Sequence, residues 1–275
     1  EMTSSLVGSE MCIRDRADSI SINTNTQSAV KARDLRSNSK QILKLKKAYE
    51  AKYSNGFFAT KRGEIIPADK DKQYCIELSY LGKNLTAWYM QRPNLSYGET
   101  KIFDKYFNTL FKNDYLPEDA YALSFWMRKI MDAWTQENPL GLEEELLTMK
   151  AYAPYHLLFA ISMVFAKCNN QTNVPSPSEC LKVASENNLV DSIINIAANC
   201  LNSAISAEKN NCEQNNKSFI PQNWVKNKSC NAGIMSAIQN YFSFLPTMNK
   251  EMDSKLKNGV KIDSKYFSYR VQAED

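Results

Sequence analysis

The sequence predicts a mainly α-helical protein, a multi-helix domain with one short N-terminal strand and one β-hairpin. Through most of the 275 residues, apolar side chains recur at steps of three and four, the spacing that places them on one face of a helix. Segments rich in Pro and Asn separate these stretches, as expected of connections between helices. With 43% hydrophobic and 11% aromatic residues, the chain can bury a sizeable core.

The strand signals lie near the N-terminus. Residues 19–23 alternate polar and apolar side chains, which predicts a strand with one buried face. Residues 56–60, Gly-Phe-Phe-Ala-Thr, and residues 65–66, two isoleucines, flank residues 61–64, a Lys-Arg-Gly-Glu sequence. Because glycine can supply the positive φ that a tight connection requires, we expect a β-hairpin here.

The helices are predicted from their apolar periodicity and their end signals. Ser37 and Asn38 can cap a first helix, and Asp69 and Asp71 a second one. Pro117 opens a later helix, with acidic residues in its first turn. The expected helical segments are residues 42–53, 74–88, 102–111, 117–134, 143–167 with a break or kink at Pro154, 189–205 and 230–244.

Three regions are expected along the chain. Residues 5–16 resemble a translated sequencing adapter, so we treat residues 1–16 as a disordered artefact and expect a C-terminal fragment of a longer protein. Residues 17–168 form the first region of the protein itself, and residues 177–275 form a C-terminal helical region. Between them lies a loop rich in Pro, Asn and Ser. Residues 210–217 are expected to be a loop, and residues 255–275 either a terminal strand or a tail.

Composition excludes several classes of protein. A formal net charge of +4 is too weak by itself to indicate a nucleic-acid partner. The longest apolar run, residues 157–166, is shorter than the roughly 20 residues of a membrane-spanning helix. Seven cysteines lie far apart without a Cys-x-x-Cys pair, which favours reduced thiols in the cytoplasm over a zinc or disulfide framework.

No catalytic group, metal site or cofactor motif is predicted. His156, the single histidine, lies in an apolar stretch and has no nucleophile at catalytic spacing, so we expect a structural role. Residues 143–145 are three glutamates that suit the first turn of a helix. The scattered glycines match neither phosphate-binding loop.

A basic segment is the candidate for nucleic-acid binding. Its residues can neutralise the phosphates of DNA or RNA; they are Lys31, Arg33, Arg36, Lys40, Lys44, Lys46, Lys47, Lys52, Lys61 and Arg62. Lysines spread around a helix also serve simply to keep its outer face in water, and we favour that interpretation.

Several polar residues near the basic segment have two interpretations each. The carboxamides of Asn25 and Gln27 can bind a base edge, or they can cap the backbone of their own turn. Asp34 and Glu64 are acids without an evident second acid or metal partner. We therefore assign neither of them a catalytic role.

The same residues resemble a known family. Residues 23–38 followed by residues 61–64 are similar to the abortive infection phage resistance (AIPR) proteins of bacteria. The positions that carry the resemblance are Asn25, Gln27, Asp34, Leu35, Lys61, Arg62, Gly63 and Glu64. Ala59 and Thr60 depart from it, because a more aromatic and acidic strand is expected there.

The resemblance implies an intracellular protein of antiviral defence whose longer relatives carry upstream, nuclease-like regions. We therefore expect the C-terminal part of a phage-defence protein that contacts nucleic acid, with any cleavage performed by the missing N-terminal part. The alternative is a non-catalytic helical scaffold that binds proteins, such as the missing domain or other defence proteins. No membrane partner is expected.

Overall fold

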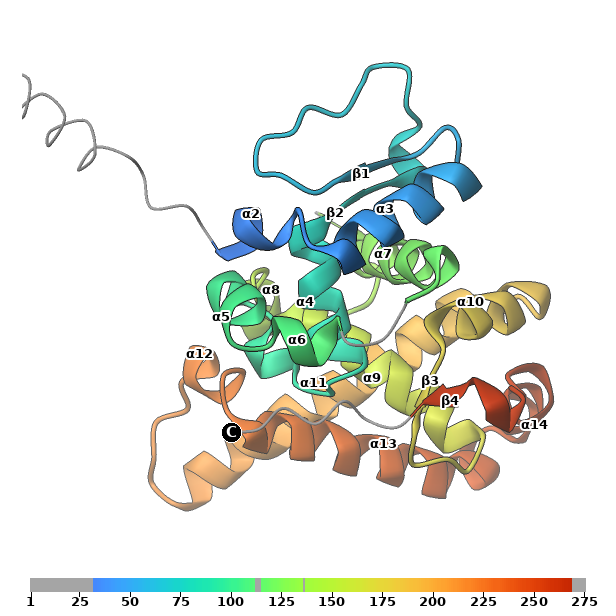
Figure 1. Ribbon diagram of the computed structural model, residues 1–275. Helices are drawn as coiled ribbons and strands as arrows, with labels where there is room; N and C mark the ends of the chain where they lie inside the picture. The colour runs from blue at the N-terminus through green and yellow to red at the C-terminus, as the bar shows by residue number, and fades with distance from the viewer. Residues whose placement is uncertain (1–31, 112–114, 136, 269–275) are drawn as a thin grey trace, which may run out of the picture. The chain divides into compact units, whose positions relative to one another are not determined.

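The computed structural model describes residues 32–111, 115–135 and 137–268. Over these residues the fold is mainly α-helical, and its strands form two two-stranded pairs (Figure 1). The predicted fold class is thus confirmed. The strand expected at residues 19–23 lies outside the described residues, as do Asn25, Gln27 and Lys31.

The first helices bear out the predicted periodicity. α2 (Ala32–Arg36) precedes α3 (Lys40–Lys52). α3 buries Ile42, Leu45 and Tyr49, which are spaced three and four residues apart. The residue that precedes α3 is Ser39, and its side chain makes no capping hydrogen bond.

The predicted β-hairpin is wrong. β1 (Phe57–Ala59) pairs in parallel with β2 (Cys75–Glu77), with Phe58 opposite Ile76. A parallel pair requires a long crossover, and residues 60–74 provide it. The physical reason is burial: Phe58 and Ile76 are buried, whereas Ile65, in the expected second strand, is 85% exposed.

The helix predicted from residue 74 begins four residues later. α4 spans Leu78–Trp88, after β2. Asp71 caps the short 3₁₀ helix η1 (Lys72–Tyr74) instead, because its side chain accepts a hydrogen bond from the Gln73 amide. Residues 75–77 are taken by pairing with β1, so the helix can begin only after them.

Three helices form the centre of the core. They are α4, α7 (Pro117–Met131) and α9 (Ala153–Cys168), which pack against one another. Trp88 and Trp126 are fully buried among them. α9 begins beside Pro154, where the break was predicted, and follows the short α8 (Glu144–Leu147).

Short elements connect the central helices. The single helix expected over residues 102–111 is two helices, α5 and α6. Within this segment the ring centres of Phe107 and Phe111 lie 4.9 Å apart, and the two rings stack. The bounds are η2 (Pro93–Leu95), α5 (Glu99–Asp104), α6 (Phe107–Leu110) and η3 (Asp132–Trp134).

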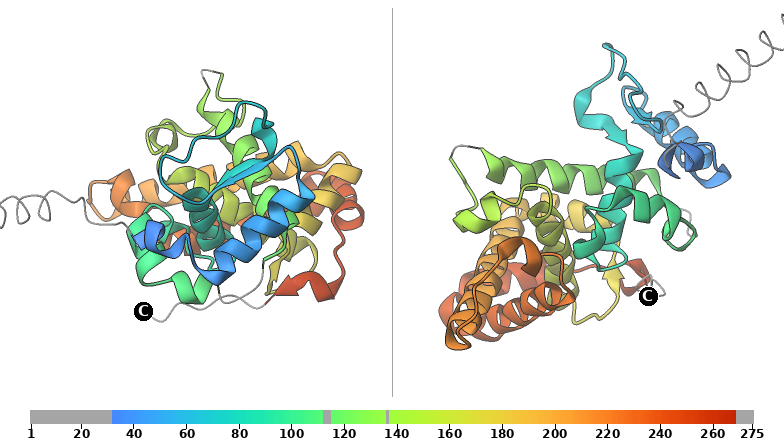
Figure 2. Two further views of the ribbon diagram at one scale, coloured as in Figure 1. Left: turned by 45° about the horizontal axis from the view of Figure 1, so that its top comes forward. Right: turned by 90° about the vertical axis from the view of Figure 1, so that its left-hand side faces the viewer.

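The C-terminal helices cover α9. α11 and α13 lie side by side and both contact α9 (Figure 1), while Figure 2 shows α2 and α3 on the opposite side of the central helices. The bounds are α10 (Pro177–Glu186), α11 (Val190–Gln214), α12 (Pro221–Trp224), α13 (Lys228–Met248), α14 (Lys250–Gly259) and η4 (Ser264–Tyr266).

α11 continues through part of the expected loop at residues 210–217. Asn215 follows its last residue and donates a side-chain hydrogen bond to the Asn211 carbonyl. Asn216 adopts a left-handed φ of 52°, which stops the helix. Local polar bonds therefore extend this helix beyond its apolar stripe.

The loop expected as a boundary lies inside one compact unit that begins at Ala32. β3 (Val174–Pro175) within this loop pairs antiparallel with β4 (Phe267–Ser268). Asn169 donates to the Val260 carbonyl and accepts from the Ile262 amide, each at 2.9 Å. The loop is thus joined to the end of the described chain. β4 lies within residues 255–275, for which either a terminal strand or a tail was expected.

Candidate functional site

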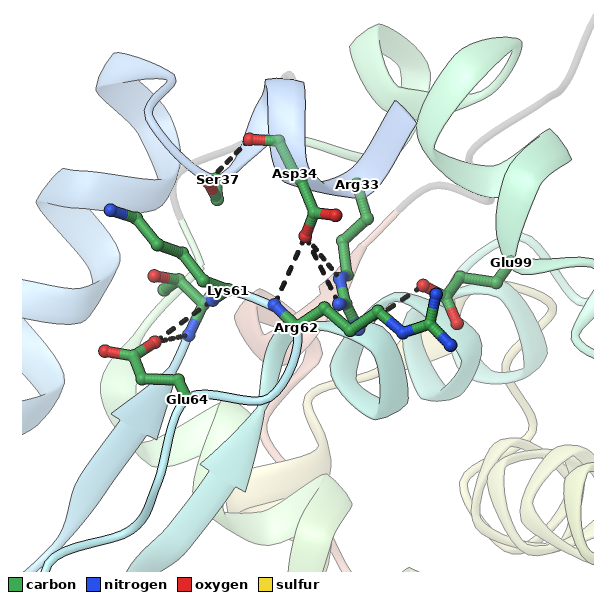
Figure 3. Close-up of polar contacts among 8 residues, drawn as sticks. Arg33, Asp34, Ser37, Lys61, Arg62, Glu64 and Glu99 are labelled. Carbon is green, nitrogen blue, oxygen red and sulfur yellow. Dashed lines mark hydrogen bonds and ion pairs between the residues drawn. The ribbon is translucent and has the colours of Figure 1, made fainter. Parts of the chain in front are cut away.

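Asp34 and residues 61–64, which are among the positions that carry the family resemblance, meet at one turn. We call residues 61–64 the basic turn (Figure 3). Glu64 Oε2 accepts hydrogen bonds from the backbone amides of Thr60 at 2.8 Å and Lys61 at 3.0 Å. Gly63 has a φ of +71°, a conformation that side chains disfavour. The Glu and the Gly of the motif therefore shape the turn.

Glu64 is held in its charged form by these contacts. Partial burial raises the pKa of Glu64, but the amides of Lys61 and Thr60 and the Lys46 ammonium lower it by more, so the net pKa is below the ordinary value. The Lys46 Nζ lies 3.3 Å from Glu64 Oε1 and also donates to the Phe58 carbonyl at 2.6 Å. Lys46 thus joins α3 to the turn.

Asp34 attaches α2 to the basic turn. Its Oδ1 accepts hydrogen bonds from the Arg62 amide and from the Arg33 guanidinium, both at 3.2 Å (Figure 3). The two motif segments, which lie far apart in the sequence, are therefore neighbours in space. Asp34 and Glu64 both bind backbone amides here, which is a structural use of a carboxylate and not an acid–base arrangement.

The two predicted arginines of α2, like Lys46 and Lys52 of α3, have partners within the protein. Arg33 is 7% exposed and lies between Asp34 and Glu99, 3.4 Å from the latter. Arg36 donates to the Phe103 carbonyl at 3.3 Å, and its guanidinium lies 4.8 Å from the centre of the Phe107 ring. Both arginines therefore fix α2 against α5 and α6.

The exposed cations lie on α3 and on the basic turn. Lys40, Lys44 and Lys47 are exposed, and their spacing of four and three places them on one face of the helix. Lys61 and Arg62 are exposed as well, and they extend from the turn in opposite directions (Figure 3). We call Lys40, Lys44 and Lys47 the basic face.

His156 has the environment of a structural residue. It is completely buried in α9, and its Nδ1 lies 3.1 Å from the Tyr152 carbonyl oxygen. Burial lowers the pKa of His156 to about 4, so the ring is neutral at pH 7.

The carboxylates of Glu143 and Glu145 approach the ammonium group of Lys209 in α11.

No cluster of three or more potential metal ligands occurs in the described ranges. Likewise, no described helix has both the length and the apolar character needed to cross a bilayer.

One feature of the fold had no signal in the sequence. A cavity of about 660 Å³ lies between the segment after the basic turn, α4 and α7. Asn84 of α4 lines it and is 3% exposed. The lining residues are dispersed between positions 66 and 132, so only folding brings them together.

No family model, no curated protein and no solved structure matched the chain. The resemblance to the AIPR proteins therefore depends on the motif residues alone.

Proposed function

We propose that the chain is the C-terminal part of a bacterial phage-defence protein and that it contacts nucleic acid through the basic face. The observation that carries the proposal is the exposure of Lys40, Lys44 and Lys47 along one side of α3. Three cations at this spacing extend over about 10 Å of helix. That length suits a row of backbone phosphates, which bind such cations with release of counterions.

The neighbouring acids support this assignment because they are directed to other partners. Glu64 binds the amides of residues 60 and 61. Asp34 binds Arg33 and the basic turn. Glu50 accepts from the Phe58 amide and pairs with Lys46. These three carboxylates are thereby engaged within the fold.

A protein-binding scaffold is the second candidate. Three large apolar side chains are exposed around the same elements, Leu35 at 66%, Leu43 at 49% and Ile65 at 85%. Exposed apolar groups beside charged ones are typical of protein interfaces. An upstream domain and other defence proteins are the partners that this alternative implies.

Titration of the full chain with labelled duplex DNA, single-stranded DNA and RNA at two salt concentrations tests the first candidate. The variant Lys40→Gln/Lys44→Gln/Lys47→Gln should bind more weakly and reduce the slope of log K against log salt by about 2 to 3. The control Lys182→Gln/Lys255→Gln/Lys265→Gln removes the same charge from other exposed sites. Equal losses in both variants, or no binding at low salt, would contradict the proposal.

The defence role requires a separate test in cells. Expression together with the recovered upstream sequence should lower the plating efficiency of phage, and the triple variant of the basic face should restore it. Unchanged plating with the unmodified gene would argue against the family assignment.

A further inference from the structure

The cavity beside α4 and α7 has the lining of a small-molecule site. Its volume of about 660 Å³ falls within the range of roughly 300–1,000 Å³ that is typical of ligand pockets. The apolar part of the wall combines flexible thioethers, aliphatic groups and one aromatic ring, from Ile66, Pro67, Ile76, Tyr80, Met127 and Met131. Such a wall suits a flat, apolar ring.

Asn84 indicates that the ligand is polar as well. Its side chain is 3% exposed, and its buried Oδ1 has no hydrogen-bond partner. Buried carboxamides are normally hydrogen-bonded, because an unpaired one destabilises the fold. Among the described residues the Asn84 side chain makes no hydrogen bond. A bound molecule that offers an acceptor to its N–H₂ group would give this buried amide a partner.

Arg128 supplies a positioned cation on the α7 side of the cavity. Its Nη1 donates to Ser124 Oγ at 2.7 Å, and its guanidinium lies 5.8 Å from the centre of the Tyr121 ring. Among the described residues, no carboxylate lies within ion-pair distance of Arg128. A guanidinium held in this way is suited to a phosphate or carboxylate group.

The formal charges of the other ionisable side chains in the wall cancel one another. Lys70 and Lys72 line the cavity together with Glu77 and Asp132. Lys70 already donates to the Ser54 carbonyl at 2.8 Å. Arg128 therefore gives the wall its excess of positive charge.

We propose that this cavity binds a nucleoside monophosphate. The base would lie against the apolar wall, Asn84 would hydrogen-bond the edge of the base, and Arg128 would hold the phosphate. The N–H₂ group of a carboxamide donates a hydrogen bond, and the edges of the bases carry acceptors that can take it. The cavity and the basic face have no residue in common, so this proposal does not depend on the proposed function.

Two asparagine variants separate binding from folding. Asn84→Leu should abolish binding and raise the melting temperature, because it removes an unpaired buried amide. Asn94 is the matched control: it is 5% exposed, but it donates to the Lys226 carbonyl and accepts from Asn231. Asn94→Leu should therefore lower the melting temperature and leave binding unchanged.

Binding is measured on the full chain with AMP, GMP, CMP and UMP, and with adenosine and inorganic phosphate as partial ligands. At least one monophosphate should raise the melting temperature and slow the alkylation of Cys75, which lines the cavity. Cys212 is half-buried on α11, and its alkylation should not change. Arg128→Gln should weaken monophosphate binding about tenfold or more and leave nucleoside binding nearly unchanged.

The proposal is overturned if no monophosphate at millimolar concentration shifts the melting temperature or protects Cys75. It is overturned equally if Asn84→Leu binds as well as the unmodified chain. Phosphate alone acting as strongly as a monophosphate would also exclude it, because the base would then contribute nothing.

Discussion

Asp119 holds the α7 helix to the loop before α10, and its removal should destabilise the whole described unit. The side chain is 6% exposed. Its Oδ1 accepts three hydrogen bonds, from Ser178 Oγ at 2.6 Å, Ser176 Oγ at 2.8 Å and the Ser178 amide at 3.2 Å. Ser176 is the last residue of the loop that the sequence suggested as a boundary, and Ser178 lies in the first turn of α10.

The expected loss for Asp119→Ala is about 3 kcal/mol. A hydrogen bond to a charged group contributes about 1.5–3 kcal/mol. The two serine hydroxyls lie 2.9 Å apart and can still bond each other, so part of the loss is recovered. The Ser178 amide loses the carboxylate outright. At about 2–4 °C per kcal/mol for a chain of this size, the melting temperature should fall by about 6–12 °C.

Urea unfolding, followed by tryptophan fluorescence and circular dichroism, measures this loss. Trp126 reports locally, because its indole N–H faces the Pro177 carbonyl at 3.5 Å. Asp119→Asn keeps the shape and should lose less, and Asp104→Ala, at an exposed position, should change stability by less than about 0.5 kcal/mol. A loss below about 1 kcal/mol for Asp119→Ala, or two separate unfolding transitions, would refute the argument.

Two further predictions concern His156 and two glycines. Because burial lowers the pKa of His156 to about 4, its neutral form stabilises the fold above the unfolded pKa of about 6.5, and this stability is lost as the pH falls from about 6.5 to 4. The pH dependence of the free energy of unfolding should therefore flatten in that range in His156→Phe, and an unchanged slope would contradict the assignment. Gly63→Ala should cost about 1 kcal/mol because of its positive φ, whereas Gly233→Ala, inside α13 with a nearest neighbour at 3.7 Å, should stabilise by roughly 0.5–1 kcal/mol. Denaturation curves of both variants check this contrast, and the same sign for both would contradict it.

The two proposed sites differ in how their charged and polar side chains are paired. Around α3 the carboxylates are used to fix the backbone, and the lysines remain on the surface. In the cavity, a carboxamide is buried without a partner and a guanidinium is held by a hydroxyl. The first arrangement suits a charged polymer in solvent, and the second suits a small ligand that enters the protein.

The helices were predictable where a long apolar stripe is buried on one side. α3, α7 and α11 carry such stripes, and each overlaps a segment that the periodicity predicted as helical, although α11 extends beyond its segment to Gln214. Prediction failed where partners are distant. Phe58 pairs with Ile76 across a crossover, and no local pattern distinguishes that parallel partner from the nearby Ile65.

The candidate site was predictable only in its composition. The sequence pointed to Asp34 and to residues 61–64, but it did not show that Asp34 and Glu64 both bind the backbone of one turn. It also could not separate Arg33 and Arg36, which have partners in the fold, from the exposed lysines of α3. Asn84 was not identified, since an unpaired carboxamide is defined by its surroundings.

The sequence by itself determined the helical class, the apolar faces and most helix positions, because these follow from side-chain spacing within a few turns of backbone. Only the tertiary structure decided the strand pairing, the partners of the charged residues and the cavity, because these depend on contacts between distant segments. The local pattern sets which surfaces must be buried, and long-range packing sets which surfaces meet.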